Sequence, residues 1–362
     1  MATVFLNGRF VSRDEAMVSA FDAGLQHGVG LFETMLAVRG HESGEQRAGW
    51  RVLHLREHLE RLSVSALGLG LSESLRVAAL EEAVMRTVER AGEEIDSARL
   101  RVRLTITGGD LNLLGAARQS HTGSATEGES AESGQPHPGP PRGGEAGQAP
   151  TLLIVAQPAT EYPAEMFERG VGVVVADLRV NPLDPFQGHK TLNYWPRLRE
   201  LQVAAGKRAA EALVFQVTNH LAGGCVSNAF VVRGGMVYTP IARGEEEEVA
   251  GVNATPGLED SATPSASAEG DHRAVLPSPV LPGIVRRWVM DWCVSEGVEV
   301  ERRMLTIDDV LGADEVFLSN SSWGVLPVVR VEREAIGDGA VGEISKRLVG
   351  AWGELAGARL SG

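Results

Sequence analysis

The chain has 362 residues, a net charge of −14 and 43% hydrophobic residues, which is enough for two ordinary domains with a sizeable core. The acidic charge argues against nucleic acid as the main partner, and no stretch reaches the ~18 apolar residues that span a bilayer. The N-terminus lacks a signal-like apolar core, and two cysteines, Cys225 and Cys293, imply no disulfide framework. We therefore expect a soluble, cytoplasmic protein in a reducing compartment, without membrane association.

The first segment predicts a β-hairpin followed by a glycine-rich entry into a strand. Residues 3–6 and 9–11 flank Asn7-Gly8, where glycine supplies the positive φ of a type I′ turn. Gly24, Gly28 and Gly30 then permit tight turns or close backbone approach before a buried strand over residues 31–38.

Two helices and a strand are predicted next. Residues 54–69 carry leucine and alanine at spacings of three and four, which is typical of an amphipathic helix. On this helix His58 and Arg61 are surface neighbours, and the guanidinium fork of Arg61 is suited to an anion, although such a pair more often belongs to a solvated face. A second helix is predicted over residues 77–90, and alternation predicts a strand over residues 98–107.

Two low-complexity segments interrupt the chain. Residues 115–150 contain no large apolar side chain, so they cannot offset the entropy of ordering, and we predict that they are disordered. Residues 151–156 resume a strand at once. A second predicted disordered insertion covers residues 242–276, which include an acidic run and a segment rich in Ser, Ala, Gly and Pro.

The segment 188–194 offers the clearest chemistry, because Lys190 follows a loop of turn-forming residues and precedes a predicted helix over residues 196–205. A lysine is unreactive at a normal pKa near ~10.4, but desolvation or a nearby cation lowers that value. The free amine then forms a Schiff base with an aldehyde such as pyridoxal phosphate. A lone lysine is more often a surface residue, so the case depends on its surroundings.

The remaining chain alternates strands and helices. Strands are predicted over residues 170–180, 212–217, 229–233, 315–318 and 326–329, and helices after Gly283, after Thr306 as N-cap, and over residues 344–355. The first N–H groups after Gly283, near Ile284 and Val285, are suited to an anion. Lys190, Arg61, Ile284, Val285 and the hydroxyl of Ser321 are together suited to one phosphorylated aldehyde.

The order of these blocks resembles the class IV aminotransferases, the fold-type IV enzymes of pyridoxal phosphate. This family includes branched-chain aminotransferases, D-amino acid aminotransferases and aminodeoxychorismate lyase. The resemblance covers nearly the whole chain outside the insertions. It rests on residues 7–8, 22–34, 58–62, 190–194, 227–230, 239–240 and 281–286, and on Ser321 six residues before Pro327.

The resemblance implies an α/β (α+β type) fold of two domains with the cofactor between them, completed by a homodimer. The smaller N-terminal α/β domain would cover residues 1–165, and the larger barrel-like domain residues 166–362. Lys190 would form the Schiff base, and Arg61, Tyr194, Ile284, Val285 and Ser321 would bind pyridoxal phosphate. The reaction would move an amino group between an amino acid and a 2-oxo acid, with no metal.

Three positions depart from the family pattern. Gly223 stands where a glutamate normally contacts the pyridine nitrogen, five residues before Asn228, and glycine cannot keep that nitrogen protonated. His27 replaces a common aromatic residue near the substrate, and Thr107 stands where D-amino acid aminotransferases place an arginine. The alternatives are therefore an aminodeoxychorismate-lyase-like enzyme, or a cofactor-binding relative with weak or no catalysis.

Overall fold

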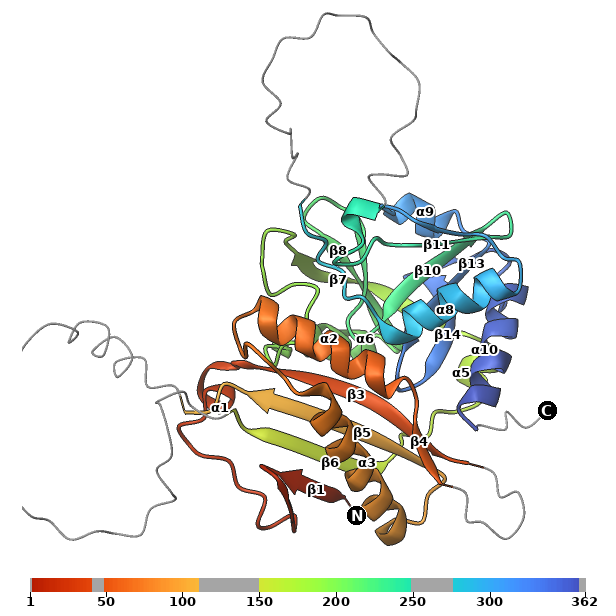
Figure 1. The fold of residues 1–362 in the computed structure, drawn as a ribbon. Coiled ribbons are helices and arrows are strands. Elements are labelled where there is room, and N and C mark those ends of the chain that lie inside the picture. The colour runs from red at the N-terminus through yellow and green to blue at the C-terminus, as the bar shows by residue number, and fades with distance from the viewer. Residues whose placement is uncertain (1, 41–48, 111–149, 249–275, 358–362) are drawn as a thin grey trace, which may run out of the picture.

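The computed structural model describes residues 2–40, 49–110, 150–248 and 276–357, which build two β-sheets, each covered by helices (Figure 1). The fold is the expected mixture of helix and sheet. The predicted insertion 115–150 lies outside the described residues apart from Pro150. Within the described ranges, no helix is both long and apolar enough to cross a membrane.

The first sheet has six antiparallel strands in the order β2-β1-β6-β5-β3-β4. Its strands are β1 (Thr3–Leu6), β2 (Arg9–Val11), β3 (Gly30–Arg39), β4 (Trp50–Val52), β5 (Arg99–Thr107) and β6 (Leu152–Pro158). The predicted hairpin is confirmed: Asn7 and Gly8 have φ angles of 47° and 89°, as a type I′ turn requires. Strand β4 was not predicted, since it is only three residues long.

Helices α2 (Leu55–Gly68) and α3 (Val77–Glu94) cover one face of this sheet, after the short helix α1 (Ala23–His27) (Figure 1). The core between them contains Leu59, Leu62 and Val84 from the helices and Leu100 and Val102 from β5. Because successive side chains of a strand point to opposite faces, the arginines that alternate with these β5 residues face away from the helices. Two of these arginines, Arg101 and Arg103, line a cavity together with residues of the C-terminal half.

The second sheet is mixed and nine-stranded, in the order β12-β11-β10-β13-β14-β7-β8-β9, with β15 paired to β14. Its strands are β7 (Val171–Val180), β8 (Glu211–Gln216), β9 (Leu221–Gly224), β10 (Asn228–Arg233), β11 (Met236–Thr239), β12 (Val300–Arg302), β13 (Glu315–Asn320), β14 (Gly324–Val331) and β15 (Glu334–Ala335). Parallel pairs join β7 to β8 and to β14, and β11 to β12. Strands β7 and β14 contribute Val173 and Leu326 to one shared core.

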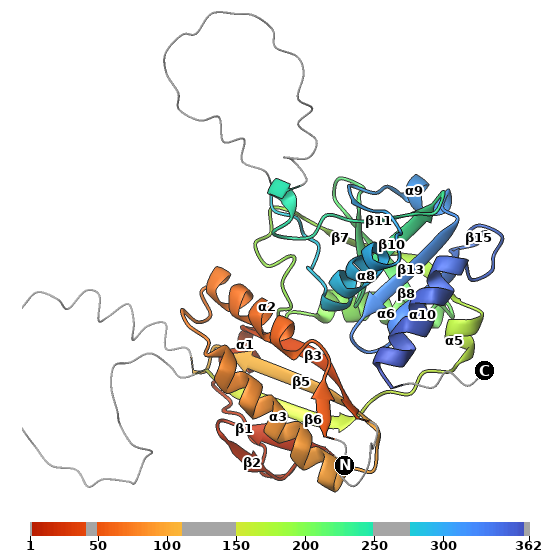
Figure 2. The same ribbon diagram turned by 45° about the vertical axis from the view of Figure 1, so that its right-hand side comes forward.

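Helices α5 (Glu165–Glu168), α6 (Trp195–Gly206), α8 (Ile284–Ser295), α9 (Ile307–Leu311) and α10 (Glu343–Leu355) surround this sheet (Figure 2). Helices α8 and α10 share a core with β10 and β13, in which Phe230 and Phe317 stack 4.7 Å apart. The predicted N-cap of α9 is confirmed, because Thr306 and Asp309 form a reciprocal capping box.

The lysine segment joins the two halves. The amide of Phe32 donates to the carbonyl of Lys190, and the amide of Leu192 donates to the carbonyl of Gly30, each at 2.9 Å. A Cβ at position 30 would lie 2.5 Å from the carbonyl oxygen of Ile106 and 2.7 Å from the Leu192 side chain. Glycine is therefore required at position 30, because the lysine segment pairs with the beginning of β3 at this point.

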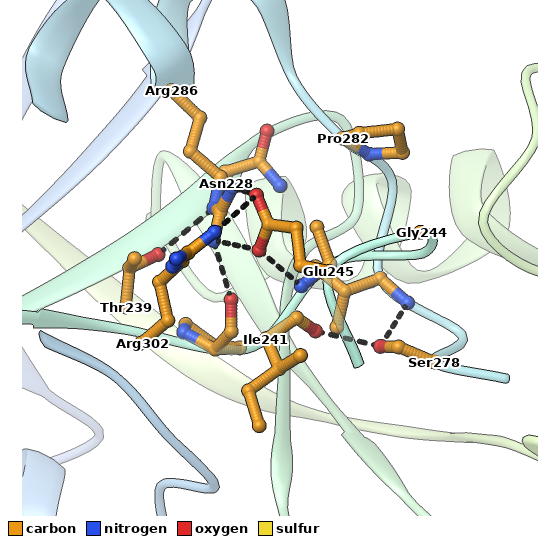
Figure 3. A network of polar contacts seen from close by, with 12 residues as sticks. Asn228, Thr239, Ile241, Gly244, Glu245, Ser278, Pro282, Arg286 and Arg302 are labelled. Atoms are coloured by element: carbon orange, nitrogen blue, oxygen red, sulfur yellow. Dashed lines mark hydrogen bonds and ion pairs between the residues drawn. The ribbon is translucent and has the colours of Figure 1, made fainter. Parts of the chain in front are cut away.

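The predicted disorder of residues 242–276 is wrong for residues 242–248, while residues 249–275 lie outside the described chain. Ala242 is fully buried, and Glu245 forms a two-pronged ion pair with Arg286 of α8 (Figure 3). The acidic composition suggested a solvated loop, but one of its carboxylates neutralises a buried cation. The domain boundary near residue 165 stays a prediction.

Candidate active site

A cavity of about 620 Å³ lies between the two halves of the chain. The N-terminal half lines it with residues of β3, α2 and β5. The C-terminal half lines it with the lysine segment, the first turn of α6, the loop after β9, the beginning of α8 and the turn between β13 and β14. Five of the predicted cofactor residues line it together with Lys190, namely Arg61, Tyr194, Ile284, Val285 and Ser321.

Lys190 stands in this cavity with its ammonium nitrogen 4.6 Å from the ring centre of Phe32 and 5.7 Å from that of Tyr194. Burial lowers the pKa of Lys190 to about 8; Glu33 opposes this shift, and the arginines Arg61 and Arg103 add to it. The lowered pKa increases the neutral fraction of the amine, which is the state that attacks a carbonyl carbon.

Arg61 is held by a buried network beside the cavity. Its guanidinium donates to both oxygens of Glu33, at 2.9 and 2.6 Å, and to the carbonyl of Pro282 at 2.9 Å. His58 shares the Glu33 carboxylate at 2.7 Å. Burial alone would raise the pKa of Glu33, but Arg61 and His58 outweigh it and hold the pKa at about 2. Arg61 thus also anchors the turn that precedes α8.

The N-terminus of α8 opens into the same cavity. Its N-cap is Gly283, and within the described chain no side chain caps the helix, so the amides of Ile284 and Val285 remain available for an anion. The side-chain amide of Asn228 donates to the carbonyl of Leu281 at 2.9 Å, and a Cβ on residue 283 would collide with Asn228 at 1.9 Å. Asn228 and Gly283 therefore belong together as the support of this helix end.

Arg286 lies on the first turn of α8 but does not offer its charge to the cavity. It is 1% exposed, and its guanidinium contacts Glu245, Thr239 and the carbonyl of Pro240 (Figure 3). The ion pair and the carbonyl satisfy the buried cation. The network stabilises the beginning of α8 and leaves the backbone amides as the donors that face the cavity.

Ser321 and Tyr194 line the cavity with different hydrogen-bond partners. The hydroxyl of Ser321 is 3.4 Å from Nε2 of His58, next to the Arg61 network. The hydroxyl of Tyr194 donates to the carbonyl of Cys225 at 3.3 Å, and burial raises the pKa of this phenol. Ser321 is thus close to the α8 end, and Tyr194 close to the loop that follows β9.

The loop of residues 224–227 is supported from behind by Glu211. This fully buried carboxylate accepts hydrogen bonds from the amides of Cys225 and Val226 and from the Ser227 hydroxyl, at 3.1–3.2 Å. Burial raises the pKa of Glu211 although these bonds oppose the shift. Sequence reasoning overlooked Glu211, since a single acid at the start of a strand carries no recognisable signal.

Two arginines of the cavity were also overlooked. Arg101 and Arg103 project from β5 into it, and the guanidinium carbon of Arg103 lies 3.9 Å from the centre of the Phe32 ring. Burial, and then the charge of Arg101, lowers the pKa of Arg103. The alternation of arginine with leucine and valine over residues 99–104 was a signal for them, because it places every second residue on the face opposite the core.

The structure does not bring His27 and Thr107 to the cavity. His27 is exposed at the end of α1. Thr107 is buried and donates its hydroxyl to Asp22, whose other oxygen caps α1 through the amide of Gly24. Thr107 is therefore a support of the glycine-rich turn, and a substrate role for either residue has no support in the geometry of this chain.

The comparisons with known proteins agree with this architecture. The profile of the amino-transferase class IV family matches residues 30–245 and 268–331. The chain belongs to the class IV aminotransferases. Members of this family use pyridoxal phosphate.

Two relatives by sequence cover nearly all of this class IV chain. A Methanocaldococcus jannaschii protein, provisionally named branched-chain-amino-acid aminotransferase, is 27% identical over 95% of this chain and 93% of its own length. A D-alanine aminotransferase of Staphylococcus aureus is 25% identical over 96% of this chain and 95% of its own length.

Solved structures confirm the fold. The branched-chain amino acid aminotransferase of Escherichia coli superposes with a TM-score of 0.72 at 23% identity, over 98% of this chain and 95% of that one. The branched-chain amino acid aminotransferase of T.th., solved with pyridoxamine 5'-phosphate, also gives 0.72 at 22% identity, over 99% and 95%. The 4-amino-4-deoxychorismate lyase of Pseudomonas aeruginosa gives 0.66 at 22% identity, over 97% and 98%.

The residues of the cavity fit pyridoxal phosphate at two ends. The uncapped amides of Ile284 and Val285, with the Ser321 hydroxyl nearby, are suited to the phosphate, and the pKa of Lys190 is suited to the aldehyde. At the pyridine nitrogen the cavity differs from the family pattern, in which a glutamate contacts this nitrogen. The described residues that line the cavity include no aspartate or glutamate.

Proposed function

We propose that the protein is a pyridoxal phosphate-dependent aminotransferase that moves an amino group between an amino acid and a 2-oxo acid. Lys190 would form the Schiff base with the cofactor aldehyde. The observation that carries this proposal is the position of Lys190, with its lowered pKa, in one cavity with the free amides of α8. When bound, pyridoxal phosphate supplies an electron sink for the bonds to the substrate Cα.

The residues of this chain would divide the remaining work. Arg61 holds the turn before α8, so that the amides of Ile284 and Val285 face the phosphate. The neutral Lys190 amine would accept a proton from the substrate Cα and return it. Arg101 and Arg103 have no ion-pair partner among the described carboxylates, and we infer that they bind the carboxylates of the substrate.

Covalent trapping tests the proposal sharply, because the chain contains only three lysines, Lys190, Lys207 and Lys346. Pyridoxal phosphate is added, the adduct is reduced with borohydride, and the modified peptide is identified by mass spectrometry. We expect the adduct on Lys190, its loss in Lys190→Arg, and its retention in the matched control Lys207→Arg. An adduct spread over the other lysines, or none, would contradict the proposal.

Product analysis separates the alternative activities. An aminotransferase converts an added amino acid to its 2-oxo acid once per cofactor, and turns over only when a second 2-oxo acid is supplied. A lyase would release pyruvate repeatedly without an acceptor. A protein that traps the cofactor on Lys190 but converts no amino acid of a broad panel would be a cofactor-binding relative.

We also propose that the protein forms a homodimer. Large apolar side chains are exposed on the N-terminal loop and α1, including Met17 at 77% and Phe21 at 73%, and beside the lysine segment, including Trp195 at 67%. We infer that these side chains contribute to the interface, because large exposed apolar surface is typical of interaction sites. Light scattering should give twice the chain mass, and Phe21→Ser with Trp195→Ser should shift it toward the monomer.

A cytoplasmic location stays a prediction. Both cysteines, Cys225 and Cys293, are buried and free, and burial raises the pKa of Cys293 to about 11.

A further inference from the structure

The loop of residues 224–227 lines the cavity directly after Gly223, the position where the family has its pyridine-nitrogen glutamate, so the pyridine nitrogen would lie at this loop. This placement rests on the proposed function, in which Lys190 binds the aldehyde carbon and α8 the phosphate. In pyridoxal phosphate the ring nitrogen is opposite the aldehyde-bearing carbon, so it would point away from Lys190. The identity of the nearest polar group at this loop decides whether the nitrogen carries a proton.

No carboxylate reaches this position from residue 223, where the family has a glutamate, or from Glu211. Gly223 has a φ angle of 135°, and a Cβ there would lie 2.8 Å from the carbonyl oxygen of Ser227, so the backbone itself is adapted to glycine. Glu211 lies behind the loop, is fully buried, and directs its oxygens to the loop amides. Glu211 does not line the cavity.

Arg197 lines the cavity and contacts this loop. Its Nη1 donates to the carbonyls of Gly224 and Cys225, at 3.2 and 3.4 Å, and its side chain lines the cavity. None of the described carboxylates forms an ion pair with it, and its Nε and Nη2 hydrogens remain available to a ligand.

The position of Arg197 along its helix is unfavourable without a ligand. It occupies the first turn of α6, which contains no acidic residue. A cation at a helix N-terminus is repelled by the helix dipole, where an acid would be stabilised. A guanidinium placed there, against a cavity wall and without a counter-ion among the described residues, is explained by a group that it binds.

We propose that Arg197 is the partner of the pyridine nitrogen and holds that nitrogen unprotonated. A guanidinium has donors but no acceptor and stays charged, so it can hydrogen-bond only to a nitrogen that keeps its lone pair. Its positive charge also opposes protonation of the ring. The ring is then a weaker electron sink than a protonated one, and the protein has to contribute more of the stabilisation of negative charge at the substrate Cα.

Nitrogen NMR of bound pyridoxal phosphate with a ¹⁵N-labelled ring tests this directly. Occupancy of Lys190 is first established by reduction and mass spectrometry. We expect the bound nitrogen to keep the chemical shift of an unprotonated pyridine throughout the pH range in which the protein is folded. In Arg197→Gln the shift should become pH-dependent, and the dissociation constant of the cofactor should rise about tenfold or more.

Arg199→Gln is the matched control, because Arg199 lies on the same helix but is exposed and paired with Glu200. It should leave both the shift and the dissociation constant unchanged. A pyridinium shift in the unaltered protein, or an unaltered shift in Arg197→Gln, would overturn the inference while the adduct on Lys190 upholds the proposed function. Failure to trap the cofactor on Lys190 would overturn both.

Discussion

The two walls of the cavity offer a ligand different chemistry. The N-terminal wall carries charged side chains on rigid elements: Arg61 on α2, and Arg101 and Arg103 on β5. The C-terminal wall offers backbone amides at α8, hydroxyl groups, Lys190, and Arg197 beside the loop of residues 224–227. Backbone amides at a helix end can bind a phosphate directly, whereas substrate carboxylates need long side chains that extend into the cavity.

The arginines of the cavity fall into two groups, those paired with a glutamate and those without one. Arg61 and Arg286 each pair with a glutamate and with a backbone carbonyl, and both support the beginning of α8. Arg101, Arg103 and Arg197 have no such glutamate within the described chain. Paired arginines therefore build the site. The unpaired ones are the candidates to bind a ligand: Arg101 and Arg103 the substrate carboxylates, and Arg197 the pyridine nitrogen.

Removal of Glu33 should have the largest effect on the N-terminal wall. Glu33→Gln leaves the buried Arg61 without its counter-charge, and we expect a loss of roughly 3–5 kcal/mol in the free energy of unfolding. The pKa of Glu33 falls from 4.5 to about 2 on folding, so its stabilisation is present above pH 4.5 and is lost as pH falls toward 2. Urea unfolding at several pH values measures both, and a variant of equal stability would show that the pairing is dispensable.

Arg103 tests whether the unpaired arginines bind substrate. Arg103→Gln should raise the KM for the amino acid about 10–100-fold, because a charged hydrogen bond is lost, with a smaller change in kcat. Steady-state kinetics measures this. Arg99→Gln, on the same strand but outside the cavity, should behave as the unaltered enzyme. Equal KM values in both variants would place substrate recognition elsewhere.

Gly223 tests the backbone character of the C-terminal wall. Gly223→Ala forces a side chain into a conformation with φ of 135°, so the free energy of unfolding should fall by about 1–3 kcal/mol. The contact with the Ser227 carbonyl adds to this cost. Gly206→Ala, at a helix end with open space around it, should be neutral or slightly stabilising. Denaturant midpoints of both variants provide the comparison.

The pH dependence of cofactor capture tests how the two walls of the cavity lower the pKa of Lys190. Since the neutral amine reacts, the rate of adduct formation should rise about tenfold per pH unit below the pKa of about 8 and level off above it. Arg103 helps to lower that pKa, so Arg103→Gln should move the midpoint upward. Stopped-flow absorbance measures the rate. A midpoint near the ordinary lysine pKa would show that the cavity does not desolvate Lys190.

Several features of the fold could be read from local pattern. The Asn7-Gly8 hairpin, the amphipathic helix that carries Arg61 and the capping box at Thr306 follow from interactions within a few residues. The alternation in β5 already separated an apolar face from an arginine face. Short elements such as β4 and β12 escaped prediction, because three residues paired to a neighbour leave no periodic signal.

The sequence by itself determined the order of the motifs and the position of Lys190, and hence the family. It also showed that Gly223 replaces the glutamate that the family normally has there. Tertiary structure alone decided the long-range pairings: Glu33 with Arg61, Glu245 with Arg286, and Arg197 with the loop beside Gly223. Residues in these pairs lie 27 to 41 positions apart along the chain. Such distances leave no trace in local propensity, and the energy of a charge depends on burial and partners that only the folded chain supplies.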